Sequence, residues 1–139
     1  MNLIDTLSVT ASGLTAQRVR LQTVASNMAN ARTTRTEDGG PYKKRMPVFR
    51  AEADPFGSML DQAISRVEVT EIAESDDPNV RVFDPGHPDA DDNGYVEYPN
   101  VNVLEEMVDM MMTARTYEAN TSVVDVTRTM ATQALELGR

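Results

Sequence analysis

Two stretches with a seven-residue hydrophobic repeat stand at the two ends of the chain and limit the folds open to it. In residues 1–36 the repeat runs in steps of three and four, as in a coiled coil, and only Arg18 interrupts it. Its positions are Ile4, Leu7, Ala11, Leu14, Arg18, Leu21, Ala25 and Met28. The pattern predicts one helix from Leu3 to Ala31, about 43 Å long at 1.5 Å per residue. Gly13 weakens this helix by up to about 1 kcal/mol, so we expect it to need a partner.

The C-terminal stretch carries a longer repeat and predicts a second helix. It begins after Pro99, where Asn102 and Glu105 resemble a capping box, and it ends at Gly138. Its heptad positions are Val103, Met107, Met110, Ala114, Tyr117, Thr121, Val124, Arg128, Ala131 and Leu135. A second apolar face is formed by Val108, Met111, Val123, Val126, Met130, Ala134 and Leu137. In a chain of 139 residues, a helix this long is typical of a coiled coil or an assembly.

The middle of the chain predicts short strands and turns. Runs of β-branched and aromatic residues, bounded by Gly, Pro, Asp and Asn, lie at Pro47–Ala51, Val67–Ile72, Val80–Phe83 and Tyr95–Tyr98. Asn93-Gly94 predicts a tight turn, Phe56–Ile64 a short helix or ordered loop, and the polar residues 32–45 a mobile loop. We therefore expect a mainly α fold with a small β region, in which long N- and C-terminal helices pair as a coiled coil. The expected parts are 1–36, 37–99 and 100–139.

Composition removes several classes of function. The chain has no Cys and one His, His87, which excludes disulfide scaffolds, thiol catalysis, Cys-type zinc sites and sites built from several His ligands. A Ser-His-Asp triad is formally possible, but the sequence shows neither a nucleophile–base pairing nor a phosphate-binding glycine loop. We expect no enzyme, no catalytic residue, no metal and no cofactor. A net charge of −9 argues against nucleic-acid binding. We also expect no Sec-type signal and no membrane span.

Charge is distributed unevenly along the sequence. Residues 1–36 carry +3, residues 37–99 carry −9 and residues 100–139 carry −3. Lys43, Lys44 and Arg45 form a local basic patch with Arg32, Arg35 and Arg50. Residues 71–109 hold twelve acids and one base, so they could pair with this patch, in another copy of the chain or in a neighbouring protein.

A calcium loop is a second interpretation of one segment. Asp89 to Gly94 matches the first half of an EF-hand loop, but the twelfth position is Asn100 where a Glu is needed, and Pro85 and Pro88 forbid an entering helix. An acidic loop that ends in a turn is the simpler interpretation. A divalent-ion module would depend on this segment alone.

The two ends also resemble a known family. Ala11 to Gln17, Ala25 to Asn30 and Thr33-Thr34 are similar to the N-terminal signature of bacterial flagellar axial proteins of the rod and hook. Asn100 to Val103, Glu106-Met107, Arg115, Tyr117 to Asn120 and Leu135 to Gly138 resemble their closing helix, and Asp84 to Asn102 resembles the proximal-rod members. The match is weakest over residues 46–66.

This resemblance implies a structural subunit of the proximal rod of the basal body. Such proteins pair their terminal helices in an inner coiled-coil layer and form the drive shaft for motility. The implied partners are other rod proteins, copies of the chain and the flagellar type III export apparatus. The implied location is the rod in the periplasmic space, reached without a cleaved signal.

Assembly residues follow from the repeats and the motifs together. They are Leu7, Leu14, Leu21, Asn27, Met28, Asn30, Met107, Met110, Tyr117, Asn120, Val124 and Leu135. Met107 and its neighbours Met110, Met111 and Met112 fit either ordinary core packing or an adaptable interface. Another axial subunit of the rod or hook, and a non-flagellar coiled-coil interaction protein, stay open as alternatives.

Overall fold

The computed structural model describes residues 3–37, 39–52 and 65–138. It contains two helices, α1 (Leu3–Ala29) and α2 (Val103–Leu137), with four strands between them in sequence. The strands are β1 (Arg45–Glu52), β2 (Arg66–Glu74), β3 (Val80–Phe83) and β4 (Tyr95–Tyr98). Both predicted helices and all four predicted strands are confirmed, so the chain is mainly helical with a small β region. The prediction for Phe56–Ile64 lies outside the described residues.

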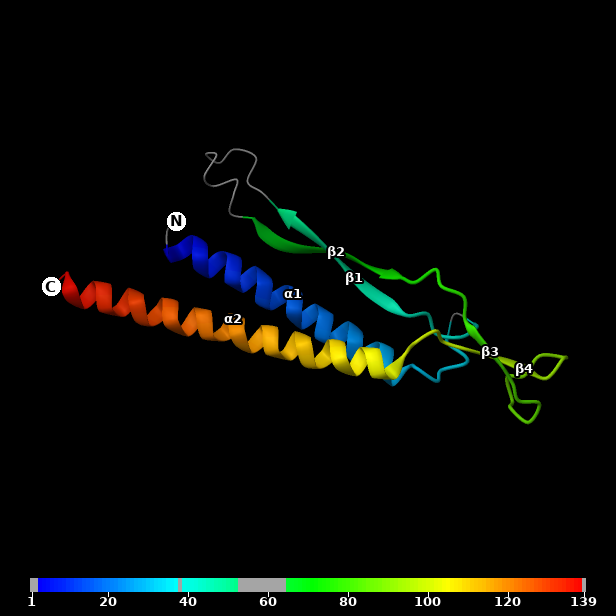
Figure 1. Cartoon of the computed structure of the whole chain (residues 1–139). Helices are drawn as coiled ribbons and strands as arrows, with labels where there is room; N and C mark the ends of the chain where they lie inside the picture. The colour runs from blue at the N-terminus through cyan, green and yellow to red at the C-terminus, as the bar shows by residue number, and fades with distance from the viewer. Residues whose placement is uncertain (1–2, 38, 53–64, 139) are drawn as a thin grey trace.

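The two helices lie side by side and run in opposite directions, with α1 between α2 and the β1–β2 hairpin (Figure 1). The Asn102 side chain caps the start of α2 by accepting a hydrogen bond from the Leu104 amide at 3.1 Å, as the capping signal predicts. Both chain ends lie at the same end of the molecule, and α2 extends beyond α1 there (Figure 1). The part of α2 nearest the C-terminus therefore has less of α1 beside it.

Two contacts define the register of the helix pair. The Asn27 side chain reaches Glu106, and a Cβ atom built on Gly13 would lie 3.4 Å from the Asn120 side chain. Fourteen residues separate the two positions on each helix, so the register is uniform over two heptads. Gly13 weakens the helix in isolation, but it leaves room for the Asn120 side chain between the two helices.

Within the chain, the contact between the helices follows the predicted heptad positions only in part. On α2 the residues turned toward α1 are mostly small or polar: Glu106, Thr113 and Thr127 are buried, and Met110, Asn120, Val124 and Ala131 are half-buried. At every second contact position, the residue that faces α1 is therefore the one just before the predicted residue. Thr113, for example, occupies the place predicted for Ala114. On α1 the buried residues are Ala16, Thr23, Val24 and Asn27, whereas Ile4, Ala11, Arg18 and Ala25 are exposed. The hydrophobic repeat did not predict this contact correctly because small and polar residues form the closest contact between the helices.

The strands form two separate antiparallel hairpins. β1 pairs with β2 and β3 pairs with β4, and a bulge at Thr70 shifts the first register after Val48. A two-stranded hairpin is marginally stable alone, and the β1–β2 hairpin packs on α1. The Val67 amide donates to the Ser12 hydroxyl of α1 at 3.1 Å. Gly94 has φ 78°, as the predicted Asn-Gly turn before β4 requires.

The predicted mobile loop at 32–45 is ordered by specific contacts at its C-terminal end. Tyr42 is 7% exposed, and its amide donates to the Thr33 carbonyl at 3.0 Å. Lys44 forms an ion pair with α2, and β1 already begins at Arg45. The prediction was wrong for residues 42–45, because composition shows that these residues are polar but not that they have partners far along the chain.

The buried apolar core is very small. Among the described residues, the buried apolar side chains are Ala16, Val24, Tyr42 and Val96. The accessible surface is 10118 Å², whereas a compact monomer of 15.3 kDa exposes roughly 7,100 Å². Large apolar side chains thus stay at the surface of the single chain.

Candidate assembly surfaces

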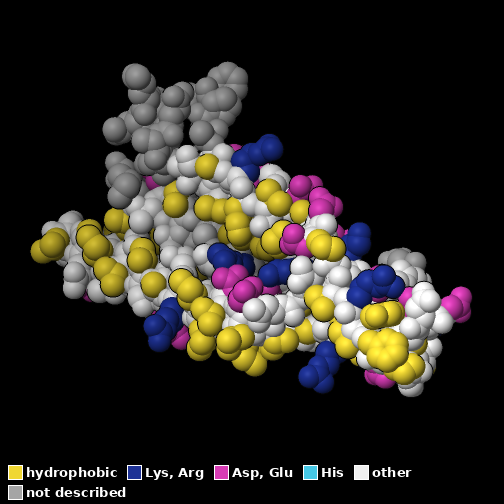
Figure 2. Space-filling model, turned by 45° about the vertical axis from the view of Figure 1, so that its right-hand side comes forward, with side chains coloured by type: hydrophobic (Ala, Val, Ile, Leu, Met, Phe, Trp, Pro, Cys, Tyr) yellow, Lys and Arg dark blue, Asp and Glu magenta, His cyan; other side chains and the backbone are white. Residues whose placement is uncertain are grey.

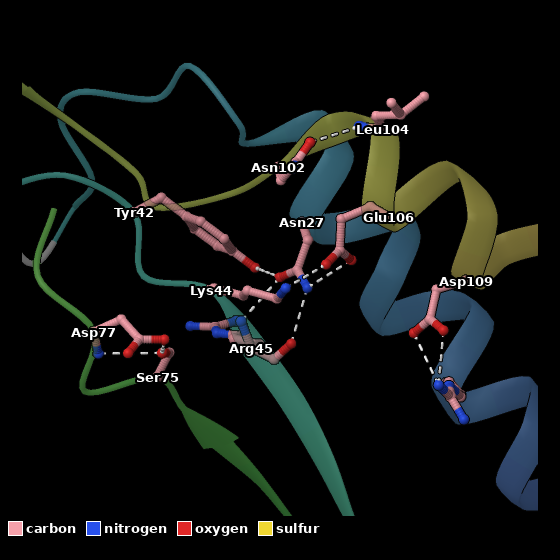
Figure 3. Close-up of polar contacts among 11 residues, drawn as sticks. Asn27, Tyr42, Lys44, Arg45, Ser75, Asp77, Asn102, Leu104, Glu106 and Asp109 are labelled. Carbon is pink, nitrogen blue, oxygen red and sulfur yellow. Dashed lines mark hydrogen bonds and ion pairs between the residues drawn. The ribbon is translucent and has the colours of Figure 1, made fainter. Parts of the chain in front are cut away.

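Asn27 lies where α1, β1 and the first turns of α2 meet, and it is 1% exposed (Figure 3). Its side-chain oxygen accepts hydrogen bonds from the Tyr42 hydroxyl and the Arg45 amide, both at 2.9 Å. Its side-chain nitrogen donates to the Arg45 carbonyl at 2.8 Å and to Glu106 Oε2 at 3.1 Å. All four hydrogen-bonding positions of the carboxamide are therefore used. We call Asn27, Tyr42, Lys44, Arg45 and Glu106 the Asn27 cluster.

Glu106 connects the Asn27 cluster to α2. Its carboxylate is 5% exposed and lies 2.8 Å from Lys44 Nζ, while its second oxygen accepts from Asn27. The hydrogen bond to Glu106 raises the pKa of Lys44, although partial burial opposes the rise. A buried carboxylate is tolerated only with such partners, so the ion pair and the Asn27 hydrogen bond depend on each other.

A second ion pair links the helices further along α1. Arg20 donates to both oxygens of Asp109, at 2.8 and 2.9 Å. Both side chains are about two-fifths exposed, so water screens this pair more than the pair at Glu106. A cavity of about 300 Å³ lies between α1, α2 and β1, and Arg20, Lys44, Glu106 and Asp109 are among its lining residues. These four charged groups are paired with one another, and Arg45, which also lines the cavity, pairs with Glu74.

Asn30 and the residues after it close the C-terminal end of α1. The Asn30 side chain donates to the Ser26 carbonyl at 2.9 Å and accepts from the Thr33 hydroxyl at 3.2 Å. The Thr34 hydroxyl donates to Asp89 at 2.7 Å, and Arg35 lies 3.8 Å from the same carboxylate. The conspicuous Asn and Thr residues of this stretch therefore fix the chain's exit from the helix.

The basic and acidic segments identified in the sequence meet within one chain. Lys44 pairs with Glu106, Arg45 with Glu74 at 3.4 Å, and Arg35 with Asp89. The sequence prediction placed this complementarity between copies or with neighbouring proteins, and the structure shows that much of it is intramolecular. Sequence charge counts could not distinguish the two cases because both give the same pattern.

The outward side of α2 carries a row of large apolar residues. We call this row the outer stripe: Val108, Met112, Val123, Val126, Met130 and Leu137. At about 100° per residue, the row lies roughly 110° around the helix from the side that contacts α1. All six side chains are exposed; Met112 is 63% and Val126 59% exposed. Figure 2 shows hydrophobic side chains along the lower margin of the molecule, where α2 runs.

The predicted assembly residues differ in how far the single chain buries their side chains. Leu7, Leu14, Leu21 and Met28 are half-buried on α1, while Met107, Tyr117 and Leu135 are exposed on α2. Asn27, Asn30, Met110, Asn120 and Val124 are buried or half-buried within the single chain. The sequence did not reveal the roles of Tyr42, Lys44 and Glu106. Glu106 stands beside Glu105 and close to Asp109, so the charge pattern did not single it out; its place in the Glu106-Met107 family motif was the available signal.

The calcium interpretation finds no support in the geometry. Asp89 bonds Thr34, and Asp91 accepts from the backbone amides of Asn93 and Tyr95 and pairs with Arg81 at 2.8 Å. The Tyr95 amide and the other donors lower the pKa of Asp91. In the part of the chain that the structure describes, no three His, Cys, Asp or Glu side chains lie close enough to share a metal ion. No described helix is long and apolar enough to cross a membrane.

Comparison with known proteins matches both helical ends. Residues 7–35 match the family model described as "Flagella basal body rod protein", and residues 92–137 match "Flagellar basal body rod FlgEFG protein C-terminal". The chain is 40% identical to the flagellar basal-body rod protein FlgC of Bacillus subtilis, with 100% of both chains covered. The chain belongs to the FlgC family of flagellar basal-body rod proteins.

Other FlgC proteins match as completely. The FlgC of Salmonella typhimurium is 40% identical with 100% of both chains covered. The FlgC of Borreliella burgdorferi is also 40% identical, with 99% of this chain and 98% of the relative covered. The family matches include α1 and α2 almost entirely, so the FlgC family relationship covers the surfaces described above.

Proposed function

We propose that this chain is a structural subunit of the flagellar basal-body rod and polymerises through its terminal helices. Full-length similarity to FlgC proteins supports the rod role. The outer stripe is the observation that supports the route of assembly, because a row of large apolar side chains on a long helix is costly to leave in water. Its partners are other rod proteins and copies of the chain.

The finer features of this role are part of the proposal. α2 pairs with neighbouring helices as a coiled coil, since residues 123, 130 and 137 and residues 112 and 126 of the outer stripe repeat at multiples of seven. Leu7, Leu14, Leu21, Met28, Met107, Tyr117 and Leu135 complete the contact surface, while Asn27, Asn30, Met110, Asn120 and Val124 shape the subunit that presents it. The subunit performs no catalysis.

The location follows from the same role. The subunit stands in the proximal part of the rod in the periplasmic space, where the assembled rod transmits torque. It leaves the cytoplasm through the flagellar type III export apparatus without a cleaved signal, and its small core favours this route because little structure has to be undone before export.

The test compares charge substitutions on two sides of α2. Met112→Asp and Met130→Asp place a carboxylate in the outer stripe, where burial without a partner costs several kcal/mol. Thr132→Asp adds the same charge to an exposed residue about 160° around the helix from Met130. Each variant is expressed in a strain that lacks the chain, and swimming, basal bodies and protein level are measured.

We expect both outer-stripe variants to be produced but to yield no rods and no swimming, while Thr132→Asp swims normally. Normal swimming of both outer-stripe variants would contradict assembly through this face. Leu14→Asp and Val124→Asp should also abolish swimming. Both residues are half-buried within the chain, so their loss reports folding and assembly together.

A further inference from the structure

Glu106 is the one buried acidic residue in the described part of α2, and it lies on the side that faces α1. Apart from the Arg20–Asp109 ion pair, which is about two-fifths exposed, the other residues of α2 on that side are uncharged, so they distinguish one alignment from another less sharply. Thr113 and Thr127 are small, and the Thr113 hydroxyl already donates to the Asp109 carbonyl of its own helix at 2.6 Å. Moving α2 by one heptad, about 10.5 Å, would bring Asn120 into the place of Thr113 and Thr127 into the place of Asn120, so uncharged polar residues would again face α1 there.

The same shift would separate the Asn27 cluster. Thr113 would then lie opposite Asn27, and its short side chain could not replace a carboxylate that reaches both Asn27 Nδ2 and Lys44 Nζ. Lys44 and Asn27 would lose a charged partner in a buried place, which costs more than the loss of an exposed contact. A single buried polar contact sets alignment in this way in other helix pairs.

We propose that Glu106, held by Asn27 and Lys44, is the positioning residue that sets the register of α2 against α1. Stability is not its main contribution, because a buried ion pair can often be exchanged for apolar residues at little cost. The register determines how far α2 extends past α1 and where the outer stripe lies relative to the rest of the subunit. This last consequence, unlike the register itself, rests on the proposed function.

Disulfide formation in the purified full-length chain reads the register directly, since the chain has no Cys of its own. Gly13→Cys with Asn120→Cys joins positions that face each other in the native register. Gly13→Cys with Thr113→Cys or with Thr127→Cys joins positions one heptad away on the same side of α2. A disulfide needs Cβ atoms about 4 Å apart, so these two pairs should oxidise only after a shift.

The three cysteine pairs are compared in four backgrounds: the otherwise unchanged chain, Lys44→Met/Glu106→Met, Glu106→Ala and Asp109→Ala. Asp109→Ala is the matched control, because it removes the other ion pair that α2 forms with the rest of the chain, Arg20–Asp109. The double variant replaces the ion pair by side chains of similar size, and Glu106→Ala uses the best helix former in case the double variant fails to fold. Circular dichroism checks folding, and gel mobility separates disulfides within a chain from those between chains.

We expect the unchanged chain and Asp109→Ala to oxidise the 13–120 pair alone. Both Glu106 backgrounds should oxidise the shifted pairs to a comparable extent while they keep their helical signal. The proposal is overturned if the Glu106 backgrounds keep the native pair alone, if the unchanged chain oxidises all three pairs equally, or if Asp109→Ala shifts as much as Glu106→Ala.

A swimming assay distinguishes a failure of this register proposal from a failure of the proposed function. Without the cysteines, Glu106→Ala should swim poorly and Asp109→Ala normally. Normal swimming of a chain whose register has shifted would contradict the link between the helix pair and rod assembly, but it would leave the register assignment in place.

Discussion

Asn27 and Glu106 make the junction of the helices a polar contact in a region where the sequence predicts an apolar one. Asn27 holds the start of β1 through the backbone of Arg45 and holds α2 through Glu106. Its removal would leave several buried groups without partners at once. Asn30, by contrast, bonds to Ser26 and Thr33, which are nearby in the sequence.

Asn27→Leu is therefore predicted to cost about 3 kcal/mol of folding free energy, since each unsatisfied buried group costs roughly 1–3 kcal/mol. Asn30→Ala should cost about 1 kcal/mol, as the loss of a partly exposed side-chain hydrogen bond does. Urea unfolding followed by circular dichroism measures both. Equal effects of the two substitutions would contradict the special position of Asn27.

Because of Lys44, the free energy of unfolding should depend on pH in the alkaline range. Its pKa is raised in the folded chain, so its contribution is complete below its ordinary pKa of 10.5 and is lost as the pH rises through the folded value. Unfolding of the unchanged chain and of Lys44→Met is compared from about pH 9 to about pH 12. The stability difference should shrink toward high pH. A constant difference would show that Lys44 acts through packing alone.

Among the helices and strands, position and type could be predicted from the sequence, but the choice of contact face could not. Turn residues such as Gly94 and caps such as Asn102 act locally, so they mark the ends of elements reliably. Thr113 and Ala114 show the limit: they are neighbours on α2, and hydrophobicity favours the alanine, but the threonine faces α1. The partner of Glu106 depends on Lys44, more than sixty residues earlier, which no local pattern reveals.

Substitutions at Gly13 test how closely α1 and α2 pack together. Gly13→Val should lower the thermal midpoint, because its branched side chain would press against Asn120 and force the helices apart. Gly13→Ala should be nearly neutral, because the gain in helix propensity of up to about 1 kcal/mol offsets the tight 3.4 Å contact. Thermal unfolding of both variants decides the point, and an unchanged midpoint for Gly13→Val would show that the helices are not in close contact there.

The whole chain is an elongated subunit with more exposed surface than its mass requires. Apolar side chains that a compact protein would bury lie along α2 and on the hairpins, including Phe83 and Leu135. The proposed burial by neighbouring subunits would account for both the small core and the long repeats. It would also explain why the hydrophobic repeat predicted the helices well but their mutual contact only in part.

Isolated chains should consequently have helix ends that open readily. In hydrogen exchange of a verified monomer, we expect slow exchange around Thr23–Met28 and Glu106–Met110, near the Asn27 cluster, and fast exchange at Leu3–Leu7 and beyond Thr127. Assembly should slow exchange at the ends. Equally strong protection of both helices from end to end in the monomer would contradict this expectation.

A cryo-EM map of intact basal bodies that contain this chain tests the central claim most directly. The account predicts that a helix of a neighbouring subunit packs against Met112, Val126 and Met130, while Asn27 and Glu106 keep their contact within each subunit. A map in which this face of α2 borders solvent, with subunits joined only through the hairpins, would contradict it.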